Sequence, residues 1–402
     1  MAEIDKGLPN TRTQVELPGA EDTEVQISEE QTQKGPVEII PGEDGGATVD
    51  FDPSAVNQPS TESHFDNLAD ILPDEVLDPI GSELRANYTD YKSSRKEWER
   101  AYTEGLDLLG FKYENRNQPF QGSSGATHPV LAEAVTQFQA TAFKELLPAD
   151  GPVRTQILGS NSTEKESQAQ RVKDFMNYQI MDQMEEYEPE FDSMLFHLPL
   201  SGSTFKKVYY DDLLGRAVSK FVPADDLIVP YTANSLDDAA AIMHVLKISE
   251  NDLRKQQVGG FYSDIDLGTA GDNVKDEITN KEKELEGISK SGKQQNIFTL
   301  LECHVDLDID GFEDMGPEGE PTGIKLPYIV TIDEGSTKVL SIRRNYAPND
   351  PKRKRVQYFV HFKFLPGLGF YGFGLIHMIG GLSRTATSAL RQLLDAGTLS
   401  NL

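Results

Sequence analysis

Residues 364–402 read FLPGLGFYGFGLIHMIGGLSRTATSALRQLLDAGTLSNL. A strand-like run, VQYFVHFKF at residues 356–364, leads into a glycine-dense turn. Apolar residues then recur at three- and four-residue spacing, as one face of a helix requires: they are Leu375, Ile379, Leu382, Ala386, Ala389, Leu390, Leu393 and Leu394. Within residues 373–397 we expect a helix of about 20 to 24 residues, roughly 30 to 36 Å long. The rest of the chain is then a body that holds this helix.

The glycines of this stretch admit a nucleotide-binding interpretation. Gly367, Gly369 and Gly372 fit GxGxxG between a strand and a helix, which is the context of a dinucleotide-binding turn. The fingerprint is incomplete, because no second strand ends in an acidic residue about 20 positions later. The alternative is that the glycines let backbone segments pack closely.

A membrane-inserting interpretation also has to be considered. Residues 364–382 carry no formal charge, and a run of that length is about long enough to span a bilayer. Pro366 and six glycines interrupt the run, however, and His377 lies inside it. A packed helix is therefore the preferred interpretation of this stretch.

Composition limits the classes of function. The chain has 402 residues, 66 of them acidic and 38 basic, for a net charge of -28. Such a chain is poorly suited to coating nucleic acid, which requires Lys and Arg to displace counterions. Cys303 is the single cysteine, so intrachain disulfides and a four-cysteine zinc site are excluded, and a reducing interior fits. The N-terminus shows no secretory signal pattern.

The order of elements predicts an α+β fold. Residues 1–63 are acidic and poor in apolar side chains, so we expect a disordered tail. A folded α+β body should then occupy residues 64–372, and the helix residues 373–402. Helices are expected at 92–109, where Ser94 and Glu97 have capping-box spacing, at 129–147, from Thr163 onward, at 191–200 and from 249. Strands are expected at 205–210, 305–310, 328–332, 338–343 and 355–364, and a mobile loop or solvated helix at 263–295.

Several acidic groups could be mistaken for metal or catalytic sites. They are Glu185, Glu186, Glu188 and Glu190; Asp225, Asp226, Asp237 and Asp238; and the DLDIDG run at 306–311. We interpret the four glutamates as a solvated run and the four aspartates as turn and helix-cap residues. The run at 306–311 is interpreted as a strand with one acidic face. The GSSG at 122–125 lacks the Gly-Lys-Ser/Thr ending of a P-loop. No sequence motif identifies a nucleophile, a metal site or a cofactor site. A catalytic triad whose residues meet only in the folded chain would leave no such motif.

The basic segment Lys352, Arg353, Lys354 and Arg355 is the one place where cations cluster. It follows a Pro-Asn-Asp-Pro turn, so we expect an exposed loop that meets an acidic neighbour or a DNA backbone.

Three segments together resemble portal proteins of tailed bacteriophages, in particular those of short-tailed phages. They are LSGSTFKKVYYD at 200–211, FVPADDLIVPYTANSLDDAAAIMHV at 221–245, and the glycine-rich turn with its helix at 362–402. The resemblance covers about residues 90–402. It implies a wing domain followed by the first stem helix, with the chain stopping where the clip should begin.

The resemblance also implies a function without catalysis. A portal forms a dodecameric ring at one capsid vertex of the virion, assembled in the bacterial cytoplasm. It docks the terminase large subunit, passes double-stranded DNA, and holds capsid and tail adaptor proteins. Neither a membrane nor a cofactor is involved.

On the stem helix the resemblance implies two sets of residues. Packing is assigned to Leu375, Ile379, Leu382, Ala386, Leu390 and Leu393. Contacts with the channel or with neighbouring subunits are assigned to Arg384, Thr387, Ser388, Arg391 and Asp395.

Overall fold

A computed structural model describes residues 64–111, 113–211, 214–268, 277–288, 297–316 and 320–400, and the backbone of 38–41 and 47–50. The chain separates into two units, Met1–Ser63 and His64–Leu402. In the first, β1 (Glu38–Pro41) pairs antiparallel with β2 (Ala47–Asp50). The remainder of the predicted disordered tail lies outside the described residues.

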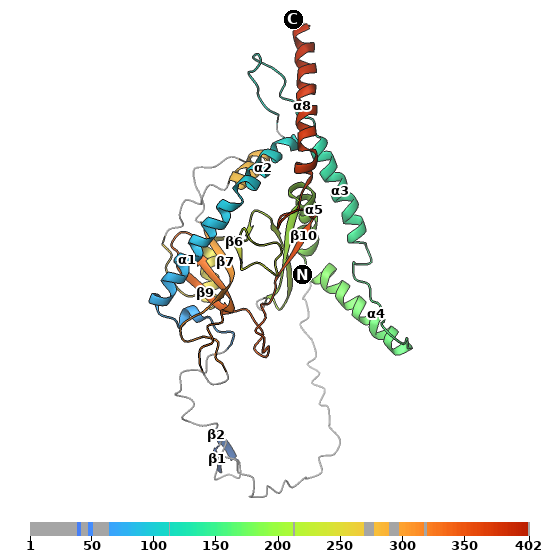
Figure 1. The fold of residues 1–402 in the computed structure, drawn as a ribbon. Helices are drawn as coiled ribbons and strands as arrows, with labels where there is room; N and C mark the ends of the chain where they lie inside the picture. Colours follow the sequence, from blue (N-terminus) through green and yellow to red (C-terminus); the bar gives the residue numbers. More distant parts are fainter. Residues whose placement is uncertain are drawn as a thin grey trace, which may run out of the picture. The chain divides into compact units, whose positions relative to one another are not determined.

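The described part of the second unit contains eight α-helices (Figure 1). They are α1 (Asp74–Ser94), α2 (Lys96–Leu106), α3 (Val130–Leu146), α4 (Thr163–Tyr178), α5 (Tyr187–Ser201), α6 (Glu250–Val258), α7 (Glu277–Leu285) and α8 (Leu375–Ser400). Three short turns of other helix types accompany them: η2 (Leu68–Asp70), η3 (Asp107–Leu109) and η4 (Gln179–Gln183).

Two antiparallel sheets form the body. The smaller has the order β10-β3-β4 and the larger β5-β6-β7-β8-β9. Their strands are β3 (Ser203–Asp211), β4 (Arg216–Pro223), β5 (Leu227–Ile228), β6 (Ala241–Ser249), β7 (Ile297–Leu307), β8 (Leu326–Asp333), β9 (Val339–Arg344) and β10 (Phe359–Lys363). The α+β class with antiparallel strands and a long C-terminal helix is therefore confirmed.

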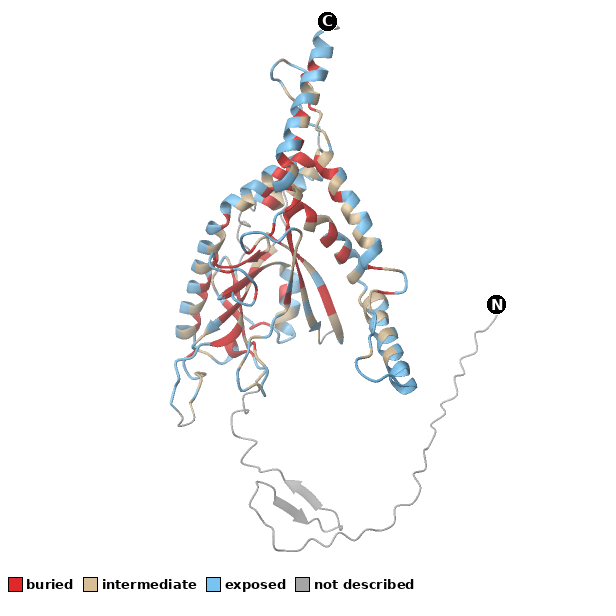
Figure 2. Ribbon diagram, turned by 45° about the vertical axis from the view of Figure 1, so that its right-hand side comes forward, coloured by how far each residue is buried: buried red, intermediate tan, exposed pale blue. Residues whose placement is uncertain are grey.

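Five apolar clusters join the described layers, and three of them position the sheets and α8. α1 and η2 cover the five-stranded sheet through Leu84, Tyr88 and sheet residues such as Val330. Phe205 and Ile242 belong to a second cluster, which joins the two sheets. A third cluster packs α2, α3, α5 and α7 around the base of α8. Figure 2 shows the buried residues gathered on the sheets and at that base, while α4 and the far half of α8 are mostly exposed.

The prediction of one helix over residues 92–109 is wrong in detail. The structure has α1 ending at Ser94 and α2 starting at Lys96, with Arg95 between them. Ser94 does not cap α2, because its hydroxyl donates to the Tyr91 carbonyl of the preceding turn. Ser249 does cap α6, since its side chain accepts from the Asp252 N–H, and the helix begins where the sequence predicts.

Two further boundaries differ from expectation. Within the predicted mobile loop, the structure describes α7, whose Ile278 is buried in the third cluster. It is thus a packed helix along one side and not a wholly solvated one. The strand expected at 305–310 begins earlier and ends at Leu307.

Candidate interaction site around the C-terminal helix

The glycine-rich turn before α8 packs directly on the α5–β3 junction. A Cβ added to Gly374 would lie 2.3 Å from the Leu200 carbonyl oxygen, and one on Gly372 would lie 2.5 Å from the Gly202 oxygen. Both distances are below any real Cβ contact, so only glycine fits at either position. The Gly372 N–H also donates to Ser203 Oγ at 2.8 Å. These contacts favour close backbone packing as the role of the glycines.

Polar side chains of α8 are held by a loop far away in sequence, residues 113–128, which we call the tether loop. The Asp395 carboxylate accepts from the Ser124 N–H at 2.6 Å, and Thr387 Oγ1 accepts from the His128 N–H at 3.0 Å. Arg391 Nε donates to the Ala126 carbonyl at 2.7 Å. Figure 1 shows this loop beside the far half of the helix.

These contacts also bear on the GSSG sequence at 122–125. A phosphate cradle needs free backbone N–H groups. Here the Ser124 N–H is taken by Asp395, and the Gly125 N–H donates to Tyr113 Oη at 3.2 Å. The loop therefore binds a carboxylate of its own chain.

The buried face of α8 is not the apolar face that periodicity indicates. Its buried residues are Ile376, Gly380, Ser383, Thr387 and Asp395. Among the residues assigned to packing, Leu375, Ile379, Ala386 and Leu390 are half-buried, while Leu382 and Leu393 are 65% and 71% exposed. Within one chain, two leucines of the predicted packing set thus have no cover.

The residues assigned to channel or subunit contacts divide into two groups. Thr387, Arg391 and Asp395 bind the tether loop of the same chain, and Arg391 also pairs with Glu114 at 3.1 Å. Arg384 lies 3.4 Å from Glu104 of α2, and Ser388 is exposed. Their predicted contacts outside the chain remain predictions.

A groove of about 800 Å³ runs between α8, the tether loop and the end of α2. Its walls combine charged residues with apolar ones, namely Glu104, Asp107, Leu108, Glu114, Arg116, Pro119, Phe120, Thr127, Arg384, Thr387, Ser388, Arg391, Gln392, Asp395, Ala396 and Leu399.

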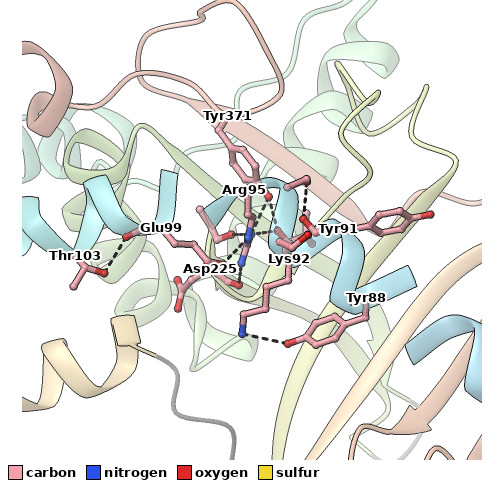
Figure 3. Close-up of polar contacts among 12 residues, drawn as sticks. Tyr88, Tyr91, Lys92, Arg95, Glu99, Thr103, Asp225 and Tyr371 are labelled. Carbon is pink, nitrogen blue, oxygen red and sulfur yellow. Dashed lines mark hydrogen bonds and ion pairs between the residues drawn. The ribbon is translucent and has the colours of Figure 1, made fainter. Parts of the chain in front are cut away.

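Arg95 fixes the base of the helix to the body (Figure 3). Its side chain is buried between α1 and α2, where Nη1 donates to the Ala224 and Leu227 carbonyls and to Tyr371 Oη, each at 2.8 Å. Nε pairs with Glu99 at 2.9 Å. Because Tyr371 lies four residues before α8, one guanidinium connects the helix root, the Pro-Ala-Asp-Asp turn and the α1–α2 junction. Sequence reasoning missed Arg95, and no local pattern marks it.

A buried charge cluster joins the two sheets. Lys207 Nζ of β3 lies 2.6 Å from both Glu302 oxygens of β7, and His304 Nε2 lies 2.9 Å from Glu302 Oε1. Burial alone would raise the pKa of the Glu302 carboxyl, but Lys207 and His304 hold it well below its usual range. Burial lowers the pKa of His244, on neighbouring β6, to about 3. The cluster is thus an ion pair flanked by neutral imidazoles.

One Ser–His pair could suggest nucleophilic catalysis. His361 Nε2 lies 3.1 Å from Ser203 Oγ. A catalytic serine must be accessible to substrate, whereas Ser203 is fully buried and accepts a hydrogen bond from Gly372. The pair anchors the glycine-rich turn.

The acidic candidates are engaged in local contacts. Glu186 forms two 2.8 Å bonds with Arg216, and Glu190 accepts from the Phe221 N–H at 2.8 Å. Asp238 accepts from the Ser235 N–H at 2.7 Å inside a turn, so of its two predicted roles the structure shows the turn role. Within the described ranges, no group of three or more His, Cys, Asp or Glu side chains is placed to hold a metal.

The basic loop is divided in its contacts. Arg353 pairs with Asp314, and Arg355 pairs with Asp306 at 2.9 Å, so both guanidiniums already meet acidic groups of the same chain. Lys352 and Lys354 are exposed. The two lysines are therefore the better candidates for an external contact.

Among the helices that the structure describes, none combines the length and apolar character needed to cross a membrane. No protein-family model matches the chain, and no curated protein matches it.

Proposed function

We propose that this chain is a subunit of a bacteriophage portal, a homo-oligomeric ring at the capsid vertex. The observation that carries the proposal is α8. It has 26 residues, about 39 Å at 1.5 Å per residue, and it extends from an α+β body while keeping leucines exposed along one side. A helix of this kind requires a partner surface, because large exposed apolar side chains favour association.

In this proposal the ring passes double-stranded DNA during packaging and ejection, docks the terminase large subunit, and later holds the capsid and tail adaptor proteins. The subunit itself performs no catalysis and needs no cofactor. The acidic composition supports passage over retention, since like charge repels the duplex.

The two alternatives make different predictions. A nucleotide-binding enzyme using Gly367–Gly372 is disfavoured by the packing of Gly372 and Gly374 on neighbouring backbone. A dinucleotide titration should show no saturable binding. A membrane-inserting protein using residues 364–382 should move with liposomes in a flotation experiment. We expect this chain to remain in the liposome-free fraction.

The decisive experiment is native mass spectrometry combined with negative-stain microscopy. The chain would be expressed with whatever residues its gene encodes after Leu402. Closed rings with a central channel are expected. A monomer at every concentration would overturn the proposal.

A further inference from the structure

α8 presents two different surfaces on its two sides. One side lines the groove, through Arg384, Ser388, Arg391 and Asp395. The other side carries Leu382, Ala386, Ala389 and Leu393, which we call the apolar stripe. Leu382 and Leu393 are 65% and 71% exposed and Ala389 is also exposed, so most of the stripe lies open within the chain, with Ala386 half-buried.

Helical geometry places these surfaces nearly back to back. With about 100° of rotation per residue, the centres of the two sets are roughly 160° apart. Both sets have the spacing of four, three and four residues, and the groove set is shifted by only two residues, or about 3 Å along the axis. The stripe and the groove therefore lie at the same level of the helix.

This arrangement suits one type of association. Two copies related by a two-fold axis would bring stripe against stripe and leave both grooves open. In a head-to-tail arrangement, by contrast, the stripe of each copy meets the groove of the next copy. Such a heterologous contact can close into a ring.

Charge supports the same partner. The stripe contains no ionisable residue. In the groove, Arg391 pairs with Glu114, and Arg384 pairs with Glu104. The Asp395 carboxylate accepts from Ser124. An uncharged stripe can cover these groups without adding a charge that has no partner in the buried contact, which would be costly. A charged helix would not satisfy this condition.

We propose that the apolar stripe of one copy packs into the groove beside α8 of the next copy, so that each tether loop helps to grip its neighbour. This inference rests on the proposed ring and adds to it the two surfaces that meet.

Cross-linking of single-cysteine variants tests the contact. Cys303 is the sole native cysteine and is buried. Ser388→Cys places a thiol in the groove, and Ala389→Cys places one in the stripe at the same level. Both positions are exposed. Each substitution is made in a full-length chain with its own affinity tag. The two chains are co-expressed, and the assemblies that they form are oxidised under mild conditions.

The expected product is a covalent dimer containing one copy of each variant, with little dimer when either variant is oxidised alone. Rings that give no mixed dimer, or that give dimers of Ala389→Cys with itself, would overturn this inference and leave the proposed function standing. Failure to form rings at all, with or without cysteines, would overturn both.

Discussion

Asp395 and Ser124 are separated by 271 positions and joined by a hydrogen bond of 2.6 Å, in which the Ser124 N–H donates to Asp395 Oδ1. The carboxylate is nearly buried although it lies on the far half of α8. The tether loop thus grips the helix by its polar side and leaves its apolar stripe free.

Asp395→Ala should detach this part of the tether loop. A hydrogen bond to a charged group is worth about 1.5 to 3 kcal/mol, and the substitution should lower the free energy of unfolding by a similar amount. Chemical denaturation measures the loss, and hydrogen exchange should quicken at Ser124. Ser388→Ala is the matched control, because Ser388 is exposed on the same helix. Equal stability of the two variants would contradict the tether.

Gly374→Ala should destabilise the root of α8. The new methyl group would lie 2.3 Å from the Leu200 carbonyl oxygen, and overpacking of this kind costs about 1 to 3 kcal/mol or more. Gly381→Ala is the control within the helix, since nothing lies within 4 Å of its Cβ position. It should raise stability by about 0.5 to 1 kcal/mol through helix propensity. Thermal unfolding of both variants measures the opposite signs, and two equal shifts would rule out the packing argument.

Arg95→Ala should be among the most damaging substitutions in the body. It would leave the Ala224 and Leu227 carbonyls and Glu99 without their buried cation, and losses of about 3 to 5 kcal/mol follow the removal of one partner from such a site. Arg95→Lys should recover only part of this loss, because an ammonium cannot reproduce the planar fork. Arg100→Ala is the control, since the Arg100 side chain is exposed, and it should unfold like the parent chain. A lysine variant as stable as the parent would show that the fork geometry is unimportant.

The charge cluster between the sheets should make the protein sensitive to acid. The folded pKa of His244, about 3, is below the ordinary value of 6.5, so the unfolded state binds the proton first as pH falls. Stability from His244 is therefore present above pH 6.5 and is lost progressively toward pH 3, by about 2 kcal/mol between pH 7 and pH 5. The depressed pKa of Glu302 acts in the same direction at lower pH. Denaturation at pH 7, 6 and 5 measures the slope. His244→Gln should reduce the slope without abolishing it, because burial also lowers the pKa of His197 to about 4 and that of His361 to about 3. If the variant's free energy of unfolding changes with pH as steeply as that of the parent chain, His244 does not cause the acid sensitivity.

Sequence patterns predicted the positions of helices better than the tertiary contacts that their side chains make. The apolar periodicity correctly indicated α3 and α8, because spacing alone defines a helix. It could not identify the buried side of α8, where Ser383 is buried and Thr387 accepts from the N–H of His128, 259 positions away. Small polar residues give no hydrophobic signal, so only the tertiary contact reveals them.

Two other discrepancies have local causes. α1 was not predicted to begin at Asp74, because its sequence includes Pro79 and is polar overall. In α4, the apolar residues Val172 and Phe175 suggest a packed face, yet both are more than half exposed. Periodicity reports an apolar face whether or not the same chain covers it. Arg95 shows the converse limit, since its carbonyl partners lie about 130 positions away.

The basic loop provides a test that separates stability from external contact. Arg353 and Arg355 pair with Asp314 and Asp306, whereas Lys352 and Lys354 are exposed. Changing both arginines to Gln should lower the free energy of unfolding by about 1 kcal/mol, the usual scale for partly exposed pairs. Changing both lysines to Gln should leave unfolding unchanged. If the loop meets DNA or an acidic neighbour, the lysine variant should nevertheless yield fewer rings or particles that retain less DNA.

Thermal unfolding and the DNA content of assembled particles measure the two effects on the same preparations. The arginine variant serves as the control for folding, because it removes the same charge from the same loop. Normal rings and normal DNA retention in the lysine variant would show that the loop serves only the internal ion pairs. A defect in the lysine variant alone would place an external partner at Lys352 and Lys354, since no loss of stability could explain it.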